Sequence, residues 1–104
     1  DQRIKALNNF LPLLDRSDAL KAYREMKEKK LYDGHTFSIL MNNPFLRFEH
    51  LFDIAREEGD YLIYNQLLRE AKTIDDAKMC FRMIGIDAPY QLKDEYALGE
   101  YINL

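Results

Sequence analysis

The sequence predicts an all-α fold, an α-α superhelix of about three helical-hairpin repeats followed by a C-terminal capping helix. Apolar side chains recur every three or four residues, and no segment alternates as a β-strand would. Gly and Pro are scarce, at 4 and 3 residues, and each falls where a helix can begin, bend or end. The third observation is that similar segments recur along the chain. The 104 residues fit a single helical-repeat domain, residues 1–104.

Two helices are expected at the N-terminal end, over residues 3–14 and 18–30. The inner side of the first carries Ile4, Leu7, Phe10 and Leu11. Pro12 should bend or end this helix, because Pro lacks the N–H that the helical ladder needs. Ser17 is the expected N-cap of the second helix. The inner side of the second carries Leu20, Tyr23, Met26 and Leu31.

The middle of the chain carries two more expected helices, over residues 35–42 and 44–58. Asn43-Pro44 predicts the start of the longer one, because Asn caps helices and Pro suits the first helical turn. Its apolar stripe is Phe45, Phe48, Leu51, Phe52 and Ala55. Gly59 then supplies the left-handed residue that ends the helix.

Three further helices are expected, over residues 61–72, 74–84 and 91–102. Asp60 caps the first of them. Thr73 caps the second, with Asp76 at the third helical position in the manner of a capping box. Gly85 is expected to close that helix. Connections of a few residues between successive helices indicate antiparallel neighbours, which is helical-hairpin architecture.

The chain repeats itself at an interval of 27 residues, the spacing from Asp33 to Asp60 and from Asp60 to Asp87. Residues 35–41 also align with residues 62–68, since each segment has an aromatic residue, a polar residue, any residue and two aliphatic residues in register. Self-similarity at this period is typical of a solenoid. The expected repeat units are residues 1–33, 34–60 and 61–87, with the C-terminal helix within 90–104.

The clearest unit runs from Asp18 to Met41. Its characteristic residues, in order, are Ala19, Leu20, Tyr23, Met26-Lys27-Glu28-Lys29, Asp33, Thr36-Phe37 and Leu40-Met41. This order resembles the pentatricopeptide repeat family of organellar RNA-binding proteins, and the resemblance extends over residues 17–87. The chain departs from the family pattern at Lys30, where the family has Gly, at Tyr32, where it has Pro, and in its shorter later units. Tetratricopeptide repeats share the second-helix positions, whereas the aromatic and polar entry to the first helix favours the pentatricopeptide interpretation.

The resemblance implies that each repeat contacts one base of single-stranded RNA, through a polar residue early in the first helix and the residue that closes the repeat. The implied pairs are Ser38 with Asp60, and Asn65 with Asp87. His35 and Leu62 would flank the bases. In the first unit Asp33 closes the repeat, and its partner is either Ile4 or Lys5. Helix capping and turn chemistry are the alternative explanation for all these polar residues.

The charge balance limits the kind of RNA contact. The formal net charge is −3 and the pI about 5.3, which argues against non-specific coating of phosphate backbones. Residues 1–33 nevertheless carry eight basic and six acidic side chains, against two and five in residues 34–60. An anionic partner is therefore expected to approach the N-terminal end first.

No motif predicts catalysis, and no cofactor or small-molecule substrate is expected. The sequence contains no phosphate-binding glycine loop and no nucleophile motif. His35 and His50 lack the spacing of a metal or general-base site, and Cys80 is expected to be a small core residue. A single cysteine favours a reducing compartment. The longest apolar stretches fall far short of the roughly 20 residues that cross a bilayer.

Two functions are therefore weighed. The first is a pentatricopeptide-like scaffold associated with single-stranded RNA, within a longer array or a mitochondrial or other organellar ribonucleoprotein. The second is a helical-repeat subunit that binds other proteins of a larger complex without reading RNA. The surplus tyrosines support it, namely Tyr61, Tyr90, Tyr96 and Tyr101. Because the chain starts at Asp1 without an initiator Met, we expect a processed chain or a fragment.

Overall fold

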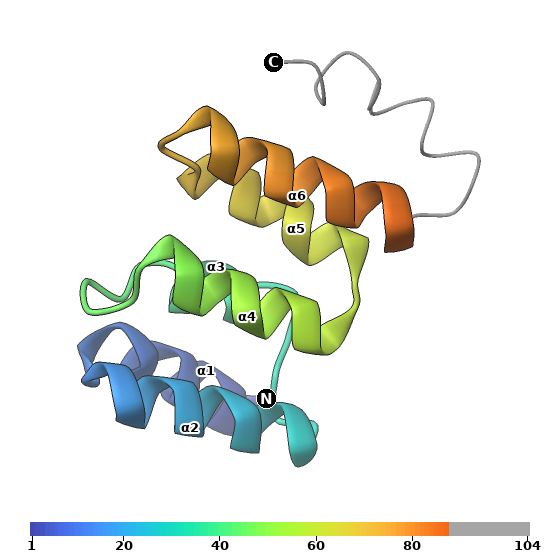
Figure 1. Ribbon diagram of the computed structural model, residues 1–104. Coiled ribbons are helices and arrows are strands. Elements are labelled where there is room, and N and C mark those ends of the chain that lie inside the picture. Colours follow the sequence, from blue (N-terminus) through green and yellow to red (C-terminus); the bar gives the residue numbers. More distant parts are fainter. Residues whose placement is uncertain (88–104) are drawn as a thin grey trace. The chain divides into compact units, whose positions relative to one another are not determined.

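The computed structural model describes residues 1–87, and these residues form six α-helices, two 3-10 turns and no strand (Figure 1). The elements are α1 (Gln2–Phe10), η1 (Leu11–Leu13), α2 (Arg16–Glu28), α3 (Thr36–Leu40), α4 (Phe48–Glu58), α5 (Tyr61–Leu67), η2 (Leu68–Glu70) and α6 (Ile74–Asp87). The all-α prediction is confirmed. The C-terminal helix expected within 90–104 lies outside the described residues. No helix among residues 1–87 is long and apolar enough to span a membrane.

The chain divides into two compact units, residues 1–47 and the residues from Phe48 onward. The first unit contains α1, η1, α2 and α3, and the second contains α4, α5, η2 and α6. This division does not fall at the repeat boundaries expected after Asp33 and Asp60. The single domain, the three repeats and their superhelical stacking remain predictions.

The core of the first unit forms where α1 and η1 pack against α2 and α3. The apolar side chains buried there include Leu11, Ala19, Tyr23, Met26, Phe37 and Leu40. The Tyr23 and Phe37 rings meet edge to face, with centroids 6.1 Å apart, an arrangement that aromatic pairs favour. The helical periodicity of α2 and α3 therefore places their aromatic residues where the sequence predicts.

A Schellman motif ends α2 at Lys30. The Leu31 N–H donates to the Met26 carbonyl at 2.8 Å, and the Lys30 N–H donates to the Lys27 carbonyl at 3.2 Å. Lys30 has φ of 58°, the left-handed conformation in which Gly is favoured. Any residue with a Cβ is sterically disfavoured there by roughly 1–2 kcal/mol. The lysine thus occupies a position whose backbone geometry favours glycine.

The second unit is a hairpin of α5 and α6 that packs against α4. Phe52 of α4 and Tyr64 of α5 are both buried, with ring centroids 5.7 Å apart. Phe81, Ile84 and the thiol of Cys80 supply the buried side of α6. Cys80 is a core residue, as predicted, and burial raises the pKa of its thiol to about 12, with Asp76 adding to the effect.

Three predicted stops and caps of the second unit are confirmed. Gly59 has φ of 64° directly after α4. The Asp60 carboxylate accepts the Leu62 N–H at 3.0 Å, and the Thr73 hydroxyl accepts the Asp76 N–H at 3.1 Å. These side chains satisfy N–H groups that a helix start leaves without an intrahelical partner.

Two predictions for the first unit are wrong. Asp15, and not Ser17, caps α2, because its carboxylate accepts the Asp18 N–H at 2.8 Å. The helix therefore starts two residues earlier than expected. Phe10 was expected inside, yet it is 59 % exposed, since the α-helix ends there and Pro12 turns the chain into η1.

Asn43-Pro44 also proves to be a turn and not the start of α4. The Asn43 carboxamide oxygen accepts the Phe45 N–H at 2.8 Å, and the Leu46 N–H donates to the Asn43 carbonyl at 3.2 Å. This is the Asx-turn alternative to a helix cap. Helix α4 begins at Phe48, which leaves Phe45 outside its apolar stripe and exposed.

The helix lengths differ in two further places. Helix α5 ends at Leu67 and continues only as the 3-10 turn η2, so it is shorter than the expected 61–72. Helix α6 runs past Gly85 to Asp87. A glycine inside a helix costs about 1 kcal/mol relative to Ala, which is too little to end the helix by itself.

Candidate functional site

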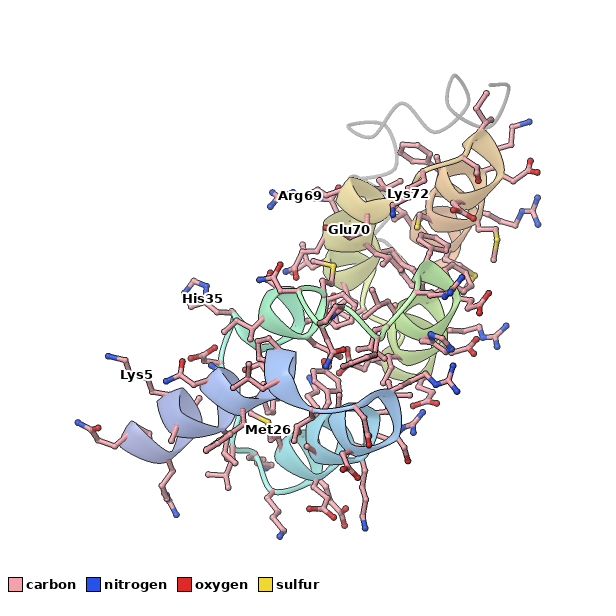
Figure 2. All side chains as sticks on the ribbon, turned by 90° about the vertical axis from the view of Figure 1, so that its left-hand side faces the viewer. Lys5, Met26, His35, Arg69, Glu70 and Lys72 are labelled. Atoms are coloured by element: carbon pink, nitrogen blue, oxygen red, sulfur yellow. The ribbon has the colours of Figure 1, made fainter. Side chains whose placement is uncertain are left out.

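An open depression on the surface of the first unit contains several of the residues that the sequence resemblance implies for RNA contact. It is lined by Asp1, Lys5, Asn8, Asn9, Asp33, His35 and Ile39. Lys5, Asn9 and His35 are exposed, and the Lys5 and His35 side chains project on the same side of this unit in Figure 2. The depression thus joins one face of α1 to the loop that enters α3.

Asp33 is held in this depression by neighbouring donors. Its Oδ1 accepts the His35 backbone N–H at 2.9 Å, and the Asn8 amide lies 3.4 Å from each carboxylate oxygen. The Thr36 hydroxyl is 3.3 Å from Oδ1 and also 3.0 Å from the Asn8 carboxamide oxygen, to which it can donate instead. In return the Thr36 hydroxyl accepts the Asp33 N–H at 3.0 Å. These bonds tie α1 to the start of α3.

The same contacts set the charge of Asp33. The His35 N–H lowers the pKa of the Asp33 carboxyl below its ordinary value of 3.8, with the Asn8 and Thr36 side chains acting in the same direction. Asp33 is therefore a carboxylate at neutral pH. Most of the donors engage Oδ1, and among residues 1–87 only the Asn8 amide engages Oδ2. Since each carboxylate oxygen offers about two acceptor positions, Oδ2 retains room for a ligand donor.

The sequence leaves open whether Ile4 or Lys5 is the partner of Asp33 in the first unit, and the two residues lie in different surroundings. Lys5 lines the depression beside Asp33 and His35, whereas Ile4 is half-buried and is not part of it. Ser38, in α3, is half-buried, and its neighbour Ile39 forms part of the depression. Of Lys5 and Ile4, Lys5 is therefore the residue that can reach a ligand held by Asp33 and His35.

In the second unit the predicted residues lie on the exposed side of α5. Leu62 is 49 % exposed and Asn65, three residues on, is also exposed. Arg69 follows at the spacing that keeps it on the same stripe, and it projects outward from η2 in Figure 2. An apolar residue, an amide and a guanidinium thus follow one another along this face.

The two closing aspartates of the later repeats lie at the ends of two helices of the second unit. Asp60 acts as the cap of α5, and its Oδ1 is engaged by Leu62. Asp87 is the last residue of α6, and the antiparallel hairpin brings that end of α6 beside the start of α5 (Figure 1). Ser38 belongs to the first unit and Asp60 to the second. Both implied pairs, Ser38 with Asp60 and Asn65 with Asp87, stay predictions.

Comparison with protein-family models, curated proteins and solved structures found no match.

Both surfaces carry groups that can bind a ligand without forming a covalent bond. The depression offers a carboxylate, amides, a cation and an apolar side chain, and the α5 stripe offers an amide, a cation and an apolar side chain. These groups suit hydrogen bonding and stacking against a polar ligand. Among residues 1–87, no three His, Cys, Asp or Glu side chains gather as a metal site would require. The Cys80 thiol is buried and protonated at neutral pH, so it is inert as a nucleophile.

Several residues of these surfaces are not indicated by the sequence, among them Asn8, Asn9 and Arg69. Asn8 is buried and Asn9 exposed on α1, where the apolar spacing of the helix gives no sign of a polar contact. Arg69 was not predicted because the expected helix simply continued through it. The one available signal is the adjacent pair of amides in a helix otherwise rich in apolar residues, since Asn is a poor helix former.

Proposed function

We propose that this chain is a pentatricopeptide-like helical scaffold that associates with single-stranded RNA, within a longer array or an organellar ribonucleoprotein. The observation that carries the proposal is the depression lined jointly by Lys5, Asp33 and His35. Lys5 comes from α1, whereas Asp33 and His35 share the loop that enters α3, and the resemblance implies base contacts for Asp33 and His35. The proposed role is binding without catalysis.

The exposed stripe of α5 supports the same proposal in the second unit. Leu62 would lie against a base, Asn65 can donate and accept hydrogen bonds at a base edge, and Arg69 can contact a phosphate. In the first unit Lys5 would contact a phosphate while Asp33 and His35 face the base. Each unit would thus combine base contact with charge neutralisation.

The expected affinity is modest. A stacked or read base contributes about 1–3 kcal/mol, and ordering a flexible strand offsets much of the sum over so few bases. The described residues alone are therefore expected to bind RNA weakly and with strong salt dependence. Further repeats or partner subunits would supply tight, sequence-specific binding.

Fluorescence anisotropy with a labelled single-stranded RNA tests the proposal. Wild type is expected to bind at low salt, and Lys5→Ala to weaken binding and reduce the slope of log K against log salt by about 1, because one phosphate contact is lost. Lys21→Ala is the matched control, since Lys21 is an exposed lysine of α2 and lies outside the depression. The double variant Ser38→Ala, Asn65→Ala is also expected to weaken binding. Absence of binding, or equal binding by all variants, refutes the proposal.

Exposed apolar residues favour a second candidate, a protein-interaction subunit of a larger complex. In the first unit Phe10 and Leu13 are 59 % and 74 % exposed, and Phe45 is exposed as well. Exposed aromatic and aliphatic side chains are typical of protein contact surfaces. Native purification of the untagged protein tests this candidate. A stable complex lost on Leu13→Asp supports it, and isolation as a lone monomer contradicts it.

A further inference from the structure

We propose that the end of α2 forms a second RNA contact, in which Lys29 and Lys30 neutralise backbone phosphates beside the ring of Tyr32, which the Lys27 ammonium holds in place. We call these four residues the basic turn. This inference rests on the proposed function and extends it, because the basic turn lies on a second helix and outside the depression around Asp33. The resemblance to the repeat family implies no ligand for the basic turn.

The backbone of Lys30 is the first argument. Its left-handed φ of 58° suits glycine, yet the chain places a long cationic side chain there. The Schellman bonds of Leu31 and Lys30 hold the residue in this conformation. Residues kept in sparsely populated backbone regions concentrate at functional sites. A lysine at this position is explained if its ammonium group has a ligand.

The charge of the basic turn is the second argument. Lys29 and Lys30 are exposed, and within residues 1–87 no carboxylate lies at ion-pair distance from either. Glu25 and Glu28 on the same helix reduce the local field without pairing with these two lysines. The C-terminus of α2 adds a partial charge of about −0.5, which one ammonium group more than balances. The remaining positive charge is available to an anion.

The contact between Lys27 and Tyr32 is the third argument. The Lys27 ammonium lies 3.9 Å from the centre of the Tyr32 ring, and Tyr32 is 40 % exposed. The cation–π contact holds the ring next to the lysines. An exposed aromatic ring among cations is typical of single-stranded nucleic-acid sites, where a base stacks on the ring and phosphates meet the cations. An acidic peptide has no base to stack, so the ring favours RNA.

Two substitutions of Lys30 separate its backbone effect from its charge. Lys30→Gly is expected to raise the urea midpoint of unfolding and to weaken binding of a labelled single-stranded RNA about threefold or more at low salt. Lys30→Ala should weaken binding equally without raising the midpoint, because alanine keeps the Cβ. Lys21→Ala again serves as the control and should change neither. Tyr32→Phe should retain binding, and Tyr32→Ala should lose it by a similar factor.

The outcomes distinguish this inference from the proposed function. If wild type binds RNA and both Lys30 variants bind equally well, the basic turn is not a contact, while the proposed function stands. If wild type does not bind RNA, both fail. If polyglutamate binds as strongly as RNA and is equally sensitive to Lys30→Ala, the surface belongs to an acidic protein partner and the inference is overturned.

Discussion

Replacing Asn43 with alanine should destabilise the first unit more than any other substitution of a polar residue in its loops. Asn43 is only 2 % exposed. Its amide donates to the Leu11 carbonyl at 2.7 Å and to the Leu14 carbonyl at 2.8 Å, and its oxygen accepts the Phe45 N–H at 2.8 Å. One side chain thus provides hydrogen-bond partners for the Leu11 and Leu14 carbonyls and for one N–H in the turn that follows α3.

The expected cost follows from the burial of these partners. Leaving the Leu11 carbonyl buried and unsatisfied costs about 1–3 kcal/mol, and each of the two part-buried bonds contributes about 1 kcal/mol. Asn43→Ala should therefore lower the free energy of unfolding by about 3–5 kcal/mol, a large fraction of the 5–15 kcal/mol typical of a domain. Urea unfolding followed by circular dichroism measures this change.

Two further variants make the measurement specific. Asn42→Ala changes the exposed neighbour and should cost less than about 0.5 kcal/mol. Asn43→Asp keeps the acceptor for Phe45 but loses both donors and places a buried charge beside two carbonyl oxygens, so it should cost at least as much as Asn43→Ala. A loss below about 1 kcal/mol for Asn43→Ala, or one equal to that of Asn42→Ala, would refute the reasoning.

Three other predictions concern single residues. Gly59→Ala should cost about 1–2 kcal/mol in urea unfolding because its φ is 64°, whereas Gly34→Ala, which meets open space at an ordinary φ, should cost clearly less. Because the pKa of Asp33 is lowered in the folded state, its carboxylate stabilises the fold at pH values above 3.8, the ordinary pKa. This stabilisation is lost as the pH falls through the lower folded-state pKa. Asp33→Asn should flatten the pH dependence of the urea midpoint below about pH 4, and an unchanged slope would contradict the network around Asp33. Because Cys80 is buried and the pKa of its thiol is raised to about 12, it should react with a disulfide reagent at least about tenfold slower in the folded protein than in urea, and equal rates would contradict its burial.

The sequence predicts the helices well where one strong local signal decides the outcome. Gly59, Asp60 and Thr73 each act as expected because a left-handed turn or a helix cap needs only the neighbouring backbone. Pro12 likewise ends α1 through its own ring and missing N–H. These elements depend on interactions within a few residues.

Prediction fails where two residues offer the same chemistry or where tertiary contacts decide. Asp15 and Ser17 are both good caps, and nothing local favours Asp15. Asn43 followed by Pro44 suits a helix start and a turn equally, and the Leu11 and Leu14 carbonyls that hold Asn43 are far away in sequence. The hydrogen bonds that join Asn8 with Asp33 and with Thr36 also connect residues far apart in sequence. For this reason the sequence indicates Asp33 and His35 but gives no sign that Asn8 belongs to the depression.

Residue-resolved NMR of the isotope-labelled chain during titration with single-stranded RNA tests the central claim most directly. Binding at the proposed surfaces should shift the backbone amide signals of Lys5, Asn9 and His35 in the first unit and of Leu62 and Asn65 in the second. The RNA concentration needed to saturate these shifts should increase as the salt concentration rises. The claim is contradicted if the signals do not move, or if the shifts concentrate on α4 and α6 and leave these five residues unchanged.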